Sequence, residues 1–375
     1  MVRFIQTSDW QIGMKASGLG EAGFDVREKR IESITNIFEA AKENKADFVL
    51  VCGDTFEHNN VGRDDVFRVI AIFNKYPEIP ILLLPGNHDA LGADCVYNRD
   101  IFSRVQNLTL LRTCDPVEVE GTTLHPIPIQ SSSRNEVDTD KIPNVIDLDG
   151  IHIGVAHGSL KGVLFDDAID LDYSIDPSCV ERSGIDFLSL GHWHSHREYK
   201  DDEGIIRIAY SGTHEQTSYT EKLAGYCLLV EIDGKGKTPN ITSIKCGQLK
   251  WDSIDFEIED KNSLIELTEK LESTSSVDML KLTLSGQLPL GSKVEFENLL
   301  EYNETQHIDF KPIVDDLEFT VLTNPEEVLD LGDPTLNQAD NYLRNLLKAE
   351  NEPEQRSEIV ETLSLLQRLA EEAVT

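Results

Sequence analysis

Short apolar runs alternate with amphipathic stretches over the first ninety residues of the chain. The runs at 2–7, 48–52 and 79–84 are rich in Val, Ile, Leu and Phe and predict strands. Between them, apolar residues recur at helical spacing at 27–43 and 61–74, which predicts two helices. Because strands and helices alternate, we expect an α/β fold built on a parallel sheet.

A group of polar residues follows each of these three strands at the point where the strand ends. The groups are Ser8-Asp9-Trp10-Gln11, Gly53-Asp54-Thr55-Phe56 and Gly86-Asn87-His88-Asp89. One such group alone is equally well explained as an ordinary Asx turn. Ligands of open α/β sheets bind beyond the carboxyl ends of the strands, however, so the repetition favours a functional site.

From residue 108 onward, short strand patterns replace the alternation with helices. We expect strands at 108–111, 117–119, 123–129, 151–156, 186–190, 206–210, 225–232 and 241–246, the later ones completing a second sheet. The Ser-rich, charged stretch 130–141 is typical of an exposed loop. Two of the strands end in further polar residues, His157-Gly158 and Gly191-His192-Trp193-His194. Five strand ends therefore present Asp, His or Asn.

The pattern changes again after residue 250 and divides the chain into three segments. Residues 1–250 carry the strand ends, and residues 251–325 combine alternating and helical patterns as a small α+β unit. Residues 326–375 form an acidic helical tail with apolar stripes at 336–347 and 359–370. These stripes fit two alternatives equally, a helical hairpin packed on its own protein and a segment that docks onto a partner.

Composition narrows the class of protein. A chain of 375 residues that is 39% hydrophobic and 27% charged is typical of a soluble globular protein with two or three domains. No apolar stretch reaches the roughly 18 residues of a membrane span, and the first residues lack the features of a signal peptide, so we expect a cytoplasmic protein without membrane contact. Six cysteines without a C-x-x-C pair predict reduced core thiols.

Acidic residues are concentrated away from the polar strand ends. The net charge is −34, and residues 251–375 carry 9 Lys and Arg against 29 Asp and Glu. This balance argues against a generally basic nucleic-acid binder. It neither excludes nor predicts a phosphate-containing substrate.

Seven strand-end residues combine carboxylate, amide and imidazole groups without a thiolate, namely Asp9, Gln11, Asp54, Asn87, His157, His192 and His194. Such mixed nitrogen and oxygen donors suit Mn²⁺, Fe or Zn²⁺. Asp54 lies in the middle of the set and can bridge two ions about 3.5 Å apart. A pair of such ions lowers the pKa of a water molecule and clamps a phosphoryl group, which indicates phosphoester hydrolysis.

The five polar groups resemble, in order, the D-x-H, GD, GNH[DE], H and GHxH motifs of calcineurin-like metallophosphoesterases. Within that superfamily the chain is similar to SbcD-type DNA-repair nuclease subunits, through Thr7-Ser8-Asp9-Trp10, Gly53-Asp54-Thr55-Phe56, Tyr210-Ser211-Gly212-Thr213 and Ser218-Tyr219-Thr220-Glu221. The resemblance covers residues 1–225 well and the rest loosely. It implies a sandwich of two β-sheets flanked by helices, a capping domain at 251–325 that binds DNA, and a tail that grips an SbcC-like ATPase partner.

The resemblance also implies roles for individual residues. One ion, Mn²⁺ by this resemblance, would be held by Asp9, position 11, Asp54 and His194, and a second by Asp54, Asn87, His157 and His192. His88 would stabilise the transition state or protonate the leaving oxygen, with Asp89 orienting its ring. Helices of the region around Val66, Phe67, Ile70 and Phe73 build a homodimer in the family, although this stripe is most simply core.

Position 11 departs from the family pattern, because Gln11 stands where the family has His. A carboxamide oxygen is a weaker ligand than imidazole, so the first site binds its ion through Gln11, binds it weakly, binds it only together with substrate, or is degenerate. We favour retained activity, because the other ligand positions are intact. We expect a DNA nuclease, with exo- or endonuclease activity, that serves in repair or defence. The alternatives are a phosphatase or cyclic-nucleotide phosphodiesterase of the same superfamily, and a non-catalytic scaffold that binds DNA ends. Four residues near the strand ends are candidate substrate contacts, namely Lys15, His58, Arg63 and Arg99.

Overall fold

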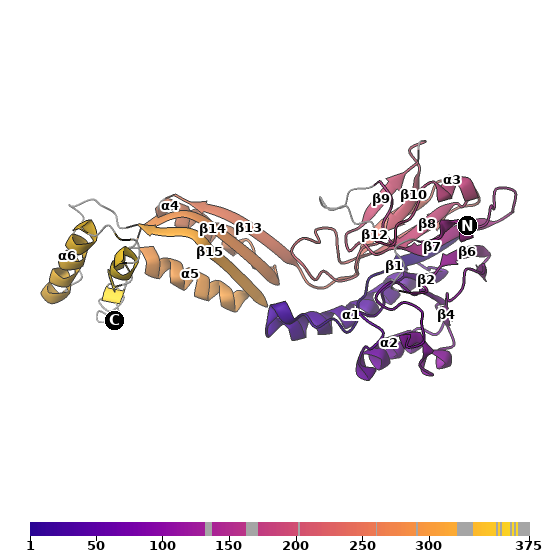
Figure 1. Cartoon of the computed structure of the whole chain (residues 1–375), viewed down its shortest axis with the longest axis horizontal. Coiled ribbons are helices and arrows are strands. Elements are labelled where there is room, and N and C mark those ends of the chain that lie inside the picture. Colours follow the sequence, from indigo (N-terminus) through magenta and orange to yellow (C-terminus); the bar gives the residue numbers. More distant parts are fainter. Residues whose placement is uncertain are drawn as a thin grey trace. The chain divides into compact units, whose positions relative to one another are not determined.

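The computed structural model describes residues 1–131, 137–162, 172–201, 203–259, 261–289, 292–320, 333–349, 352, 355–360, 362–363 and 365–366. The chain divides into two compact units, Met1–Leu249 and Lys250–Thr375 (Figure 1). No helix of the described residues is long and apolar enough to cross a membrane. All six cysteines are free thiols, as the sequence predicts.

The first unit contains two six-stranded sheets. The first sheet has the order β12 (Asn240–Lys245), β11 (Tyr226–Ile232), β1 (Val2–Thr7), β2 (Phe48–Cys52), β3 (Ile81–Leu84) and β4 (Leu108–Leu110). The second has the order β5 (Val117–Val119), β6 (Thr122–Ile127), β7 (Ile151–His157), β8 (Phe187–Gly191), β10 (Ile206–Tyr210) and β9 (Arg197–Lys200). In the first sheet, β1, β2, β3 and β4 pair in parallel, each with the next. In the second sheet, β6, β7, β8 and β10 do the same.

Apolar side chains from both sheets form one core between them, including Phe4, Phe48, Leu82, Ile153 and Phe187. The outer face of the first sheet is covered by α1 (Ala22–Glu43) and α2 (Arg63–Lys75), and the second sheet packs against the short helix α3 (Cys179–Ser183). Strands buried on both faces read as nearly continuous apolar runs, which explains the pattern at β2 and β3. The expected α/β sandwich of two sheets is therefore confirmed.

Two of the strands expected in the second sheet lie in the first. β11 pairs antiparallel with β1, and β12 pairs antiparallel with β11, so the first sheet is mixed rather than purely parallel. An apolar strand pattern shows that a strand is buried but carries no information about its neighbour. The start of α1 also differs: the helix begins at Ala22, five residues before the expected start, because buried Ala22 and Val26 continue its apolar stripe. Strand β9 was not expected.

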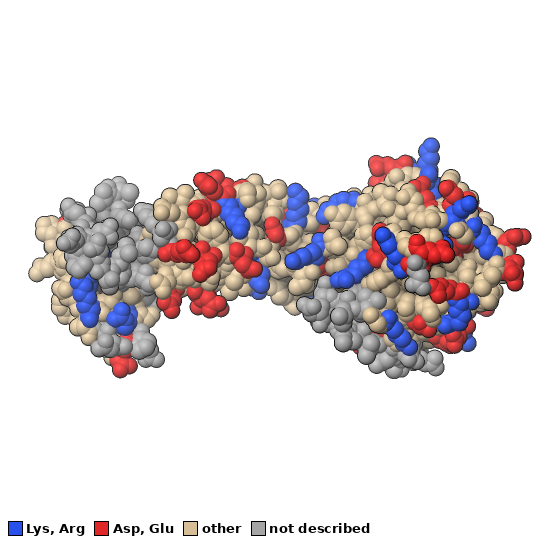
Figure 2. Space-filling view, turned by 90° about the horizontal axis from the view of Figure 1, so that it is seen from above, with Lys and Arg blue, Asp and Glu red and all other residues tan. Residues whose placement is uncertain are grey.

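The second unit begins with a βαβαβ segment. Its three parallel strands have the order β13 (Trp251–Ile258), β14 (Met279–Pro289) and β15 (Asp309–Thr320), and the connecting helices are α4 (Lys261–Glu272) and α5 (Lys293–Gln306). Leu264, Leu267 and Phe296 of the helices pack with the strand residues Leu280 and Leu282. On the face drawn in Figure 2, Asp and Glu side chains are interspersed with Lys and Arg over the described residues.

The tail contains α6 (Pro334–Ala349) and a further helical segment at 355–360. Leu343 and Leu347 of α6 pack against Ile359, Val360 and Leu363. The two expected stripes thus contact each other, as in a helical hairpin. The expected stripe position at residue 370, and residues 132–136 of the expected loop, lie outside the described residues.

Glycines in the polar groups allow strand ends to approach closely, both between neighbouring strands of one sheet and between the two sheets. A Cβ on Gly86 would lie 2.2 Å from Oδ1 and 2.6 Å from the backbone nitrogen of Asp54, and one on Gly191 would lie 2.1 Å from the carbonyl oxygen of Cys52. These distances are far below van der Waals contact. Packing at the strand ends therefore requires glycine at these positions, at Gly86 between β2 and β3 of the first sheet and at Gly191 between the two sheets.

Gly86→Ala tests this requirement, with Gly92→Ala as the matched control in the same loop. The new methyl group at position 86 collides with fixed backbone, so we expect a loss of about 1–3 kcal/mol in the free energy of unfolding. A Cβ at position 92 meets no atom within 4 Å, so that variant should unfold like the wild type. Urea denaturation of both variants measures the difference, and equal midpoints would refute the packing role.

Candidate metal centre

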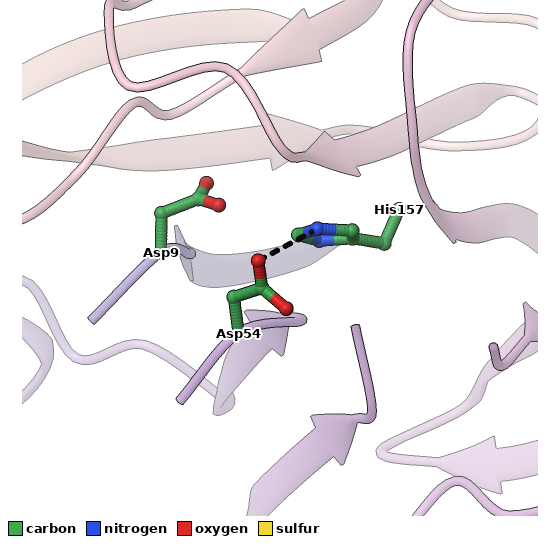
Figure 3. A group of neighbouring side chains, drawn as sticks. All are labelled: Asp9, Asp54 and His157. Atoms are coloured by element: carbon green, nitrogen blue, oxygen red, sulfur yellow. Dashed lines mark ion pairs between the residues drawn. The ribbon is translucent and has the colours of Figure 1, made fainter. Parts of the chain in front are cut away.

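The carboxyl ends of β1, β2 and β7 bring two carboxylates and an imidazole together. Ligand atoms of Asp9, Asp54 and His157 all lie within 4.8 Å of one another, and all three side chains are buried. Figure 3 shows the two carboxylates and the ring at the strand ends, with the ion pair between Asp54 and His157. These residues, 148 positions apart along the chain at the extremes, form a group suited to a divalent cation.

The backbone at this point is strained in the same way at four of the seven expected ligand positions. The φ angles are 54° at Asp9, 41° at Gln11, 53° at Asp54 and 110° at His192. Residues other than glycine rarely adopt positive φ, and such strain is typical of functional sites. Hydrogen bonds between the loops hold it: the N–H of Asp9 donates to Gly53 O at 3.1 Å, and that of Gln11 donates to Asp54 O at 2.9 Å.

Hydrogen bonds fix which atom of each imidazole faces the group. His157 Nδ1 donates to the carbonyl oxygen of Cys52 at 2.8 Å, so Nε2 points inward, 3.2 Å from Asp54 Oδ2 and 2.9 Å from Asn87 Oδ1. His192 Nδ1 approaches the same Asn87 oxygen at 3.1 Å, and the N–H of His192 donates to the Asp9 carboxylate at 3.0 Å. Five of the expected ligands therefore form one contiguous polar cluster.

The electrostatics of the cluster favour a cation. Burial and the neighbouring Asp54 carboxylate raise the pKa of Asp9, although His157 and His194 act in the opposite direction. Burial alone would raise the pKa of Asp54, but His157 and His88 outweigh it and lower that pKa to about 2. The carboxylate of Asp54 in turn raises the pKa of His157 to about 9 against the effect of burial. The proton on His157 thus balances part of the buried negative charge, as a bound metal ion would, and the residues fit such an ion.

His194 contacts a carboxylate that the expected site does not include. Its Nδ1 lies 2.6 Å from Glu221 Oε1, and the carboxylate is 11% exposed. Burial opposes the charge of the ring, but the hydrogen bond to Glu221 and the charges of Asp9 and Glu221 raise the pKa of His194. The signal for Glu221 is the Ser218-Tyr219-Thr220-Glu221 segment, which resembles the family without revealing a role.

A buried arginine supports the loop that carries Asp9 and Gln11. Arg30 on α1 is 1% exposed and donates to the carbonyl oxygens of Asp9 at 2.8 Å and Trp10 at 2.6 Å. It also donates to Thr213 Oγ1 at 3.0 Å. An arginine in an amphipathic helix is typical of a solvated face, so the sequence pattern did not indicate this role.

The carboxamide of Gln11 has no hydrogen-bond partner among the described residues, and the side chain is 9% exposed. Its backbone is held by Asp54, as described above. The backbone of Gln11 therefore adjoins the cluster, whereas no hydrogen bond joins its side chain to the other described ligands.

His88 lies beside the cluster rather than within it. Its Nδ1 hydrogen-bonds to the carbonyl oxygen of Glu57 at 2.9 Å, and its Nε2 is 4.0 Å from Asp54 Oδ2. The ring is 36% exposed, so a substrate can reach it. Hydrogen bonding of Nδ1 to Glu57 leaves Nε2 as the atom that faces the site.

The expected role of Asp89 is wrong. Its carboxylate accepts hydrogen bonds from the N–H groups of Gly86 at 2.7 Å and Phe56 at 3.1 Å and from the Tyr97 hydroxyl, and none from His88. Burial and the Asp54 charge raise the pKa of Asp89 to about 6. Asp89 braces the backbone that carries Asn87 and His88, and the Glu57 carbonyl orients the His88 ring instead.

The four candidate substrate contacts differ in whether their side chains are exposed or already bonded within the protein. Arg99 donates to the carbonyl oxygens of Asn59 at 3.1 Å and Val61 at 2.9 Å, so it holds a loop. Arg63 is exposed with its guanidinium 4.9 Å above the Phe67 ring. Lys15 and His58 are exposed. Arg99 is thus engaged in structure, and the other three side chains remain accessible to a ligand.

Comparisons with known proteins agree with this geometry. The family pattern described as calcineurin-like phosphoesterase matches residues 2–215. The DNA double-strand break repair protein Mre11 of Archaeoglobus fulgidus is 24% identical over 73% of this chain and 70% of its own length. An SbcCD nuclease subunit of Staphylococcus saprophyticus is 22% identical, covering 65% of this chain and 69% of its own.

A third relative is the uncharacterized metallophosphoesterase YhaO of Bacillus subtilis, 21% identical over 76% of this chain and 72% of its own length. These identities are low, and they mark the relatives as distant. The family pattern, in contrast, spans more than half of the chain and includes every strand end that bears a cluster residue. From its sequence and from the arrangement of these side chains, this chain belongs to the calcineurin-like phosphoesterase family of metal-dependent hydrolases.

Proposed function

We propose that the protein is a DNA nuclease that uses two divalent ions, Mn²⁺ in the first instance, to hydrolyse phosphodiester bonds. The observation that carries this proposal is the position of Asp54. Its carboxylate lies 3.2 Å from His157 Nε2 and 4.0 Å from His88 Nε2, and it accepts the backbone N–H of His88 at 2.9 Å, so it lies between the two imidazole rings. A carboxylate at that position suits a ligand shared by two ions.

The chain supplies two overlapping ligand sets in this proposal. Asp9, Gln11, Asp54 and His194 would hold one ion, and Asp54, Asn87, His157 and His192 the other. When bound, the ions would supply Lewis acidity to a phosphoryl group. The protein holds the donors in place through the Cys52 and Glu221 hydrogen bonds to His157 and His194.

His88 is the proposed proton donor to the leaving oxygen. Its Nε2 faces the site because Nδ1 is bound by the Glu57 carbonyl. Carboxylate oxygens of Asp54 and Glu57 lie 4.0 Å from the ring nitrogens. General acids of this kind contribute about 10²–10⁴-fold to the rate.

DNA is the proposed substrate because two of the relatives are a DNA double-strand break repair protein and a nuclease subunit. A second unit with its own core follows the hydrolase unit, as a capping domain would. A phosphatase or cyclic-nucleotide phosphodiesterase remains the rival activity. A scaffold without activity is the second rival, favoured by the neutral ligand at Gln11.

We also propose that the protein binds an SbcC-like ATPase, forms a homodimer and is located in the cytoplasm. On α6, Tyr342 is 64% exposed and Leu346 is 39% exposed although the helix packs on the segment that follows, so an SbcC-like ATPase could dock there. In α2, Val66, Ile70 and Phe73 are core residues, but Phe67 is 40% exposed and is available to a second copy. Six free thiols agree with the reducing cytoplasm.

The wild type and Gln11→His, assayed side by side, decide between nuclease and scaffold. We expect the wild type to cleave end-labelled single- or double-stranded DNA with Mn²⁺, and the variant to need less Mn²⁺ because imidazole is the better ligand. Gln306→His, at an exposed position in the second unit, is the control for an added histidine. Cleavage by the histidine variant alone would favour the scaffold, and turnover of small phosphoesters without DNA cleavage would establish the phosphatase.

His88→Ala should separate metal binding from catalysis. The ring contacts Glu57 and approaches Asp54 but is not in either ligand set, so calorimetric Mn²⁺ titration should give the wild-type stoichiometry. DNA cleavage at saturating Mn²⁺ should fall by about 10²–10⁴-fold. Loss of bound Mn²⁺ in this variant would contradict the assigned role.

The affinity for Mn²⁺ should rise with pH. The pKa of His157 in the metal-free protein is raised to about 9, so below that pH the ring carries a proton that the ion must displace. Each unit of pH should therefore raise the apparent affinity about tenfold between about pH 6 and 8.5. Titration calorimetry in buffers of different ionisation enthalpy measures both affinity and proton release, and a flat profile would be incompatible with His157 as a ligand.

A further inference from the structure

Glu221 is the only carboxylate among the described residues that the structure shows bonded to the His194 ring. Oε1 lies 2.6 Å from His194 Nδ1. The other oxygen, Oε2, accepts hydrogen bonds from the N–H groups of Thr217 at 2.7 Å and Ser218 at 3.2 Å. The Thr217 hydroxyl lies 3.1 Å from Oε1 and 3.2 Å from Oε2. The carboxylate is therefore held by the backbone and hydroxyl of the 217–218 segment, with Oε1 toward the ring.

The backbone on either side of His194 is also fixed. The carbonyl oxygen of His194 accepts the N–H of Thr213 at 2.9 Å, and the N–H of His196 donates to Leu223 O at 3.0 Å. Rotation of the ring and the choice of its tautomer are the freedoms that remain. A carboxylate can only accept hydrogen bonds, so it requires the proton of the neutral ring to be on Nδ1.

We propose that Glu221 is a positioning residue that holds His194 in the tautomer whose Nε2 lone pair is available to a divalent cation. This inference rests on the proposed function, since it gives His194 a ligand role. Gln11 is neutral, so His194 is the one imidazole in the proposed set of Asp9, Gln11, Asp54 and His194. That set therefore depends on the orientation of this ring more than the second set depends on either of its two histidines.

Two variants, ranked by their affinity for Mn²⁺, distinguish this positioning role from simple packing. In Glu221→Gln, the two N–H groups of Thr217 and Ser218 need an acceptor, so the amide oxygen turns toward them. The NH₂ group then faces His194 and donates to Nδ1, which moves the ring proton to Nε2 and blocks the lone pair. Glu221→Ala leaves the ring free to adopt either tautomer. Glu221→Gln, although closer in shape to the wild type, should therefore lose more affinity for Mn²⁺ than Glu221→Ala.

Calorimetric titration of the full chain with Mn²⁺ measures the effect. We expect two ions in the wild type, and one of the two bound about 10–100-fold more weakly in Glu221→Gln, with a smaller loss in Glu221→Ala. Glu198→Gln is the matched control, because Glu198 pairs with His196 at 3.3 Å, two residues further along, and should bind as the wild type does. Wild-type affinity in Glu221→Gln, or a larger loss in Glu221→Ala, would overturn the proposal.

A second measurement does not depend on metal. Nitrogen-15 NMR of the metal-free protein, at a pH where the ring is neutral, reports which nitrogen of His194 carries the proton. We expect Nδ1–H in the wild type and in Glu198→Gln, and Nε2–H in Glu221→Gln. The same tautomer in the wild type and Glu221→Gln would refute the inference. A wild type that binds no Mn²⁺ would instead refute the proposed function, and the NMR result would then still decide whether Glu221 sets the tautomer of His194.

Discussion

The candidate site depends on hydrogen bonds that cross between the two sheets and fix their offset. His157 Nδ1, at the end of β7, donates to Cys52 O at the end of β2. Gln6 on β1 donates to the carbonyl oxygens of Leu190 at 3.1 Å and Ala209 at 2.8 Å, on β8 and β10. Each such bond contributes about 0.5–1.5 kcal/mol, far less than the apolar core that holds the sheets together. The core provides the stability, and these few polar bonds provide the register that brings the ligands into contact.

Charged groups buried in the first unit are tolerated because each has hydrogen-bond or ion-pair partners. Arg30 is surrounded by backbone carbonyl oxygens, Asp89 by N–H groups and the Tyr97 hydroxyl, and Asp54 by imidazoles. Unpaired burial of such groups would cost several kcal/mol each. Asp9 accepts hydrogen bonds from the Ser8 hydroxyl and the His192 N–H, but burial and the neighbouring Asp54 carboxylate still raise its pKa. The shortage of positive charge is thus located at the point where a cation is proposed.

Patterns within single elements predicted much of this structure. Contacts between elements that lie far apart in the sequence were not predicted. The strands ending at Thr7, Cys52 and Leu84 and their polar ends are local signals, and five of seven expected ligands form one hydrogen-bonded cluster. The neighbour of β11 is set by tertiary packing, so its sheet was misplaced. Glu221 and Arg30 are ordinary polar residues in sequence, and only burial reveals their contacts. Asp89 was misassigned because adjacency along the chain to His88 does not place two side chains in contact.

The distances in sequence between the contacting groups have a consequence for biosynthesis. Asp9 contacts the backbone of His192, and Arg30 contacts Thr213, so each group finds its partner only after 183 further residues have been made. Long-range pairings of this kind form slowly, because the chain must close large loops before it gains their contacts. A polypeptide that ends before His192 therefore lacks the assembled ligand cluster.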